Sequence, residues 1–172
     1  SIIIMNYSYL KKLIQQNLFQ TLLILNFLII SSAFYIEYIL KVPACNLCLY
    51  QRIPYYLSIL ILLYMVFNKS TNIILIKFLV ILMFINIILS LYHVGVEQQI
   101  ISEPILCKSN SNFQNVDQLL ENLKNNTFIS CKDINFTFLG FSLASINVFI
   151  STILAYFYVL LILNVEKIRR NH

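Results

Sequence analysis

The four cysteines of this sequence are the residues best suited to carry chemistry. Cys45 and Cys48 form a Cys-x-x-Cys pair at the expected start of a helix, whereas Cys107 and Cys131 lie in the one long polar stretch of the chain. The free N–H groups and the dipole of a helix N-terminus favour a thiolate and lower a thiol pKa from its free value of about 8.5. Because the thiolate is the form that attacks a disulfide, the close pair is predicted to be redox-active.

Arg52 and His93 are the polar residues expected beside this pair. Arg52 follows Cys48 by four residues, so its guanidinium shares a helical face with the thiols. It could stabilise a thiolate or hold an oxygen of a bound acceptor, or it could instead meet lipid phosphate. His93, at the end of a later predicted helix, could bind a quinone oxygen or move a proton, or it could act only as a polar helix cap. Glu37 and Glu97 are expected to be solvated residues at the membrane rim.

A zinc site and two inert structural disulfides are the alternative uses of the four cysteines. Zinc ribbons need two close Cys-x-x-Cys pairs, but this chain has one close pair and two widely separated cysteines, so no metal site is expected. Two inert structural disulfides are more plausible than zinc, but the helix-start position of Cys45 and Cys48 argues against inert bridges, because structural disulfides rarely close such a tight ring beside lipid.

The elements that must position these residues are membrane helices. The chain of 172 residues is 59% hydrophobic and 11% charged, with a mean hydropathy of +0.79, whereas soluble domains carry about 25% charged residues. The net charge is +5, and the positively charged residues flank apolar segments. This distribution does not indicate a nucleic-acid partner. Apolar runs long enough to cross a bilayer cover residues 18–40, 47–67, 73–92 and 138–165. We therefore expect an all-α membrane protein, a four-transmembrane-helix bundle that forms a single membrane domain over residues 1–172.

The distribution of lysine and arginine predicts how the bundle is oriented. Three basic flanks, at residues 11–12, 69 and 167–170, fall on one side of a four-helix bundle. By the positive-inside rule this side is cytoplasmic, so both termini are expected in the cytoplasm and all four cysteines in the outer, oxidising compartment. The first apolar run exceeds the roughly 7–15 residues of a signal-peptide core, so it is expected to be retained as a helix.

The outer loop, residues 93–137, has a helical pattern of its own. Apolar residues recur there at helical spacing: Phe113, Val116, Leu119, Leu120 and Leu123. Ser111 with Gln114 has the pattern of a capping box. The loop is therefore expected to contain a short amphipathic helix, which rests either on the outer membrane face or on the bundle. In either place the helix would position Cys107 and Cys131, which flank it.

Three segments of the chain resemble the DsbB family of bacterial disulfide bond formation proteins. The first is Pro-Ala-Cys-Asn-Leu-Cys-Leu-Tyr-Gln-Arg-Ile-Pro at residues 43–54, and the second is Tyr-His-Val-Gly-Val-Glu at residues 92–97. The third is Cys131, followed by Phe-Leu-Gly-Phe-Ser-Leu-Ala-Ser-Ile-Asn at residues 138–147. Within the third segment, Gly140 and Ala144 also form a small-xxx-small pair suited to close helix packing. The segments occur in the family's order, and the resemblance spans nearly the whole chain.

The resemblance implies an inner-membrane thiol:quinone oxidoreductase. Such an enzyme reoxidises a periplasmic DsbA-like thioredoxin-fold protein and passes the electrons to membrane quinone, either ubiquinone or menaquinone. The Tyr-Gln-Arg continuation of the Cys-x-x-Cys pair favours DsbB over a vitamin K epoxide reductase-like thiol–quinone enzyme. Outside enzymes, the alternative is a non-catalytic membrane scaffold held by two structural disulfides.

The resemblance also implies roles for individual residues. The catalytic cysteines would be two pairs: Cys45 with Cys48, and Cys107 with Cys131. Cys48 would lie nearest the quinone, and Arg52 and His93 would lie on the quinone side. Cys107 would take the mixed disulfide from the DsbA-like partner.

Overall fold

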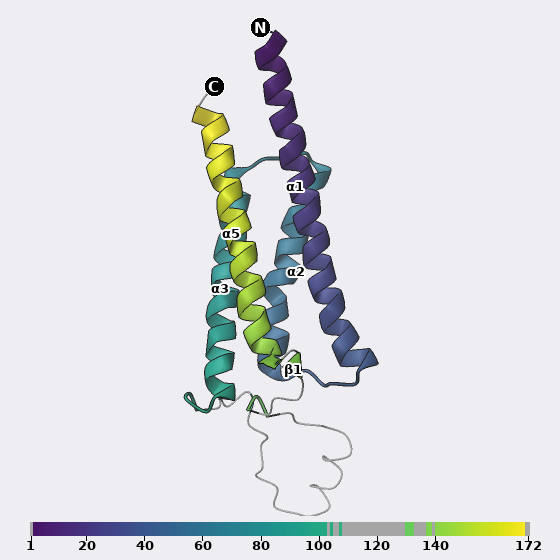
Figure 1. Ribbon diagram of the computed structural model, residues 1–172, viewed down its shortest axis with the longest axis vertical. Coiled ribbons are helices and arrows are strands. Elements are labelled where there is room, and N and C mark those ends of the chain that lie inside the picture. Colours follow the sequence, from purple (N-terminus) through teal and green to yellow (C-terminus); the bar gives the residue numbers. More distant parts are fainter. Residues whose placement is uncertain are drawn as a thin grey trace, which may run out of the picture.

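The structure, a computed structural model, describes residues 2–102, 104, 107, 130–132, 137–138 and 140–170. Within these residues, four long helices run side by side (Figure 1): α1 (Ile2–Phe34), α2 (Asn46–Phe67), α3 (Ile73–Glu97) and α5 (Leu143–Arg170). Each contains an apolar stretch long enough to cross a bilayer. The predicted fold class is therefore confirmed, and the chain is a multi-pass membrane protein. The amphipathic helix predicted around residues 111–123 lies outside the described residues.

A short hairpin precedes α5, at the end of the bundle opposite the two termini (Figure 1). Strand β1 (Thr137–Phe138) pairs antiparallel with β2 (Phe141–Ser142). The turn between them contains Gly140 with φ of +84°, a conformation that glycine adopts without steric cost. Helix α5 therefore begins later than predicted, at Leu143, and Gly140 lies outside it. The predicted Gly140/Ala144 helix-packing pair is wrong, because this turn separates the glycine from the helix.

Helix α1 ends in a wider turn. Residues Tyr35–Ile39 form the π-helical segment η1, in which the Leu40 N–H donates to the Tyr35 carbonyl at 3.2 Å. A π turn rotates the side chains around the helix axis, and such turns are frequent at functional sites. Lys41 then adopts a left-handed backbone conformation with φ of +54°, after which the chain leads into α2.

Helix α3 extends beyond the predicted end at Tyr92 and reaches Glu97. Gln98 is its C-cap residue, and the Gln98 N–H donates to the Val94 carbonyl at 2.9 Å. His93 and Glu97 therefore occupy positions i and i+4 on one face of the same helix.

Two clusters of buried side chains hold the bundle together. The larger one joins apolar residues from all four long helices, among them Leu22, Leu62, Leu79 and Leu161. The smaller one joins Leu47 and Val96 to three of the cysteines. The outer surface of the long helices is also rich in large apolar side chains, which suits contact with lipid.

Candidate redox site

Cys45 and Cys48 lie where α2 begins. Cys45 is the N-cap residue, and its Sγ accepts a hydrogen bond from the Cys48 backbone N–H at 3.3 Å. This contact satisfies one of the N–H groups that a helix start leaves without an internal partner. Both cysteines are free, and their Sγ atoms lie 2.9 Å apart. The pair can therefore share a proton, or close into a disulfide, with little movement.

The surroundings of Cys45 stabilise its thiolate. Cys45 is buried and precedes the apolar span of α2. The pKa of Cys45 is lowered to about 5: the hydrogen bond with the Cys48 thiol is the largest cause, burial opposes it, and His93 lowers the pKa further. Because the thiolate is the nucleophile, Cys45 is reactive at neutral pH.

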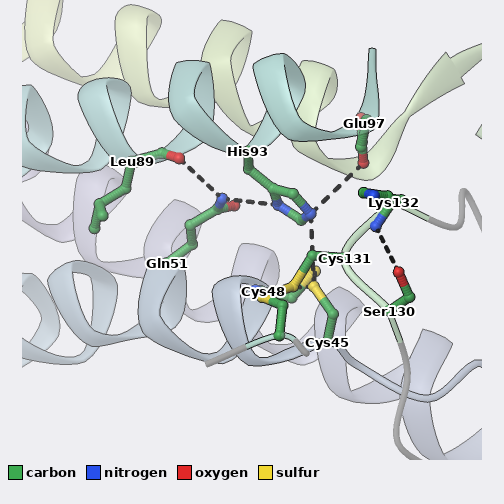
Figure 2. The surroundings of a disulfide bond; sticks show 10 residues. Cys45, Cys48, Gln51, Leu89, His93, Glu97, Ser130, Cys131 and Lys132 are labelled. Atoms are coloured by element: carbon green, nitrogen blue, oxygen red, sulfur yellow. Dashed lines mark hydrogen bonds and ion pairs between the residues drawn. A yellow bond between two sulfur atoms is a disulfide. The ribbon is translucent and has the colours of Figure 1, made fainter. Parts of the chain in front are cut away.

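His93 on α3 faces this pair and is only 2% exposed. Figure 2 shows its Nε2 directed at Cys45 Sγ, 3.5 Å away, with Glu97 Oε1 3.7 Å from the same nitrogen. Its Nδ1 lies 3.1 Å from Gln51 Nε2. His93 does not cap α3, because the helix continues for another turn. The structure instead makes it a partner of Cys45.

Arg52 on α2 pairs with Glu37 on η1. Arg52 Nη1 lies 2.5 Å from Glu37 Oε2, and the guanidinium carbon lies 5.3 Å from the centroid of the Phe34 ring, a cation–π contact. The prediction that Glu37 and Glu97 are solvated rim residues is wrong. The π turn carries Glu37 to Arg52, and the extension of α3 carries Glu97, 7% exposed, to His93.

A cavity of about 170 Å³ lies beside the Cys-x-x-Cys pair. Its walls come mainly from α1, η1, α2 and α5 and are largely aliphatic, with Ile29, Ile146 and Ile150 among them. Polar side chains also line it: Ser32, Glu37, Cys45, Cys48, Gln51, Arg52, Tyr55, His93, Glu97 and Asn147. An apolar cavity with a few convergent polar groups is the usual form of a small-molecule site. These residues suit a quinone, since the aliphatic walls can hold its ring and the guanidinium can donate to a ring oxygen.

Cys107 and Cys131 form a disulfide, which is the pairing that the family resemblance implies. Both are buried, and they pack in one cluster with Cys45 and Val96, with Cys48 at its edge. Figure 2 shows Cys131 close to Cys45 and Cys48. The structure therefore brings all four predicted catalytic cysteines together in one cluster.

Gln51 and Asn147 also belong to the site, although the sequence analysis gave them no role. Gln51, buried on α2, links His93 to Asn147 on α5: its Oε1 accepts from Asn147 Nδ2 at 2.9 Å. The signal that could have found them is their polarity, because polar side chains inside a membrane span are costly unless paired and often mark functional sites.

Cys45, Cys48 and His93 form a group that could also hold a metal ion. Their two Sγ atoms and a ring nitrogen lie within 4.8 Å of one another. The spacing of the cysteines alone does not indicate this group, because His93 lies on a different helix. Thiolate and imidazole suit a borderline cation such as zinc, but closing the Cys45–Cys48 disulfide would remove two of the three ligands.

Comparison with known proteins agrees with this geometry. The family model described as "Disulfide bond formation protein DsbB" matches residues 15–161. The chain is 28% identical over 160 residues to the uncharacterized protein RP370 of Rickettsia prowazekii (strain Madrid E), covering 89% of this chain and 91% of that protein. No solved structure matches the chain. Because the family model covers most of the sequence, the chain belongs to the DsbB family, whose members are oxidoreductases that form disulfide bonds.

Proposed function

We propose that this protein is a thiol:quinone oxidoreductase of the bacterial inner membrane that reoxidises a periplasmic DsbA-like thioredoxin-fold protein. One observation carries the proposal. The free Cys45–Cys48 pair packs in one cluster with a disulfide and also lines a largely apolar cavity. It therefore contacts both a bond that thiol exchange can use and a site suited to a lipid-soluble electron acceptor.

The reaction starts at the Cys107–Cys131 disulfide. A thiolate of the reduced partner attacks Cys107 Sγ, which forms a mixed disulfide and releases Cys131 as a thiolate. The second thiolate of the partner then attacks its own mixed-disulfide sulfur and releases Cys107. The partner leaves as a disulfide, and its two electrons remain on the loop cysteines.

The loop cysteines are next reoxidised by the Cys45–Cys48 pair in its disulfide form. A loop thiolate attacks this bridge and forms an interloop disulfide, and the second loop thiolate then closes the Cys107–Cys131 bond again. Cys45 and Cys48 are left as a dithiol. The described state, with the loop pair bridged and the helix pair free, corresponds to the end of this step.

The last step reoxidises the helix pair. A bound quinone supplies an acceptor for two electrons and two protons. Cys45 carries the thiolate at neutral pH, so Cys48 first passes its proton to Cys45 across 2.9 Å before its sulfur gives up electrons at the cavity. Closure of the Cys45–Cys48 disulfide releases two electrons and the one proton that the pair still carries. The second proton that the acceptor takes up comes from water, to which Cys45 lost its own proton on ionising, and Arg52 would hold the acceptor oxygen. DsbA has a potential of about −120 mV, so its reoxidation requires an acceptor as strong as a quinone.

The proposal places the cysteines in the periplasm and both termini in the cytoplasm. The two termini lie at one end of the bundle, and the hairpin lies at the other, on the same side as the start of α2 (Figure 1). The connection between α2 and α3 lies toward the end with the termini (Figure 1), and Lys69 belongs to this connection. The positive-inside rule supports this orientation.

The test uses the purified full-length protein with a reduced DsbA-like partner and a short-chain ubiquinone or menaquinone. Quinone absorbance and free thiols are followed together. We expect one quinone to disappear for every two thiols, at a rate that depends on Cys48. Tyr56→Phe, a conservative change at a half-exposed position of α2, is the matched control and should turn over normally.

Two outcomes would contradict the proposal. Stable thiols and stable quinone, across several partners and both quinone types, would favour two structural disulfides. Thiol loss without quinone loss would show that the electrons go to another acceptor, and the cavity would then have a different ligand.

A further inference from the structure

A network of hydrogen bonds continues from His93 into the bundle. It joins residues of α2, α3 and α5: Gln51, Tyr55, Asn86, Ser90, Asn147 and Ser151. All are buried except Asn147, which is half-buried. Because amides, hydroxyls and carbonyls differ in what they can donate and accept, the donor and the acceptor of each hydrogen bond in the network can be assigned.

Ser90 fixes the orientation of Asn147. The single hydroxyl proton of Ser90 is donated to the Asn86 carbonyl at 2.8 Å, so Ser90 Oγ can only accept its other hydrogen bond. The atom of Asn147 that lies 2.7 Å from Ser90 Oγ must therefore be the donor Nδ2. Asn147 Oδ1 then faces Tyr55, whose hydroxyl donates to it at 2.6 Å.

The orientation of Asn147 in turn sets that of Gln51. Asn147 Nδ2 also donates to Gln51 Oε1 at 2.9 Å, so the other end of the Gln51 amide, Nε2, faces His93. A separate contact agrees with this orientation: Gln51 Nε2 lies 3.5 Å from the Leu89 carbonyl oxygen, which can only accept. Two independent anchors, Ser90 and Leu89, thus give the same direction.

The oriented amide decides which nitrogen of His93 carries the proton. Gln51 Nε2 donates to Nδ1 at 3.1 Å, so Nδ1 must be the acceptor and the proton must lie on Nε2. Nε2 is the nitrogen 3.5 Å from Cys45 Sγ. We propose that Gln51 and Asn147 are positioning residues that hold His93 as its Nε2–H tautomer, with this proton directed at Cys45. The inference deepens the proposed function by naming what prepares Cys45 for exchange.

The same contact disfavours the other tautomer of His93. An Nδ1–H would face the N–H of Gln51, so that two donors would meet. The charged groups nearby are Glu97, on the Nε2 side, and the Arg52–Glu37 pair, which lines the same cavity. His93 therefore directs its Nε2–H toward the Cys45 sulfur.

Nitrogen NMR of histidine tests this inference directly. The chain has two histidines, so the full-length protein is labelled with ¹⁵N-histidine and the second signal is removed with His172→Ala. The dithiol state is prepared in lipid nanodiscs without quinone or partner. We expect an acceptor-type shift for His93 Nδ1 and a protonated-type shift for Nε2. A protonated Nδ1 in this protein would overturn the inference.

Three substitutions test the positioning residues. Gln51→Glu offers a carboxylate to the ring, so Nδ1 should become protonated while the side-chain shape is kept. Asn147→Leu removes the anchor of the amide, so a second population with Nδ1–H should appear. Asn26→Leu, the matched control, removes a buried amide that bonds Tyr158 instead, and it should leave the His93 signals unchanged. An unchanged pattern in folded Gln51→Glu would refute the role of Gln51.

The tautomer and the proposed function can fail separately. The NMR measurement needs neither quinone nor partner, so an Nε2–H tautomer without turnover would leave the inference standing and reject the function. Normal turnover with a protonated Nδ1 would reject the inference and leave the proposed function standing. As a kinetic check, Gln51→Leu should slow reduction of quinone about tenfold at neutral pH, the effect expected from one lost hydrogen bond beside a thiolate.

Discussion

The two cysteine pairs of this protein differ in their surroundings, although every cysteine except the half-buried Cys48 is buried. Cys45 and Cys48 are three residues apart at a helix N-terminus and remain free, whereas Cys107 and Cys131 are 24 residues apart and bridged. The helix pair contacts an imidazole, a backbone N–H and a cavity. The loop pair packs beside it in a cluster with Val96. Burial therefore sets apart only Cys48, whereas the position at the cavity distinguishes the helix pair as a whole.

This difference matches a division of labour in the proposed reaction. A pair that must give electrons to a lipid-soluble acceptor has to lie at the bundle wall and needs a stabilised thiolate. A pair that must be attacked by a protein partner needs only to be a disulfide that the partner can reach. The following predictions test whether the division is real.

The largest effect is expected from removing one cysteine of each pair. Cys48→Ser should lower steady-state turnover by on the order of 10³-fold or more, since it removes a reacting sulfur. The Cys107–Cys131 bridge should still form and should still oxidise one partner dithiol per protein in a single burst. Cys131→Ser should give the opposite pattern, with no oxidation of the partner but continued quinone reduction when a small dithiol is supplied.

Stopped-flow assays of thiol loss and quinone loss, run side by side on Cys48→Ser and Cys131→Ser, measure both activities of each variant. If Cys48→Ser and Cys131→Ser lost the same activities, the two pairs would not have separate roles. Steady turnover by Cys48→Ser would remove Cys48 from the quinone step altogether.

The sequence was sufficient to predict the parts of this site that depend on local patterns. Apolar runs of membrane-spanning length identify the four helices, and the position of Cys45 ahead of such a run predicts a thiol at a helix start. These signals lie within one segment each. These signals were enough to predict the fold class and to predict that Arg52 shares a helical face with the Cys-x-x-Cys pair.

The contacts that could not be predicted depend on how separate elements meet. The Glu37–Arg52 pair depends on the π turn that ends α1, and no pattern of apolar residues predicts such a turn. The bonds from Gln51 to His93 and Asn147 require the rotation of three helices about their axes, which their nearly uniform apolarity does not specify. The hairpin at Gly140 was missed because its apolar neighbours read as a continuation of the last helix.

The second largest effect is expected at Arg52, which lines the same cavity as the helix pair. Arg52→Ala removes a charge-assisted donor at the cavity, so the apparent KM for quinone should rise roughly 10- to 100-fold. The KM for the reduced partner should stay the same, because the partner acts at the loop disulfide. Steady-state kinetics with each substrate varied in turn gives both constants.

Glu37→Gln is the matched control for Arg52→Ala. It keeps the guanidinium and removes only its carboxylate partner, so quinone should bind as well as before or better. An unchanged KM for quinone in Arg52→Ala would refute a supporting role for this residue, and an equal rise in both KM values would point to a general structural defect.

The smallest effect is expected in the pH dependence of the helix pair. The pKa of Cys45, lowered to about 5, means that its thiolate is present above this pH and is lost as the pH falls through it. With the loop pair bridged, ultraviolet absorbance of the reduced protein should report thiolate formation near pH 5, well below the free thiol pKa of about 8.5. His93→Ala should raise the pKa of Cys45 but not to that of a free thiol, because the Cys48 hydrogen bond, the larger cause, remains.

The turnover of the unsubstituted protein should fall a few-fold in mild acid, where the Cys45 thiolate is lost, and should change little at higher pH. A titration left in place by His93→Ala would mean that the imidazole does not stabilise the thiolate, and the contrast between the two cysteine pairs would then rest on the helix N-terminus and Cys48 alone.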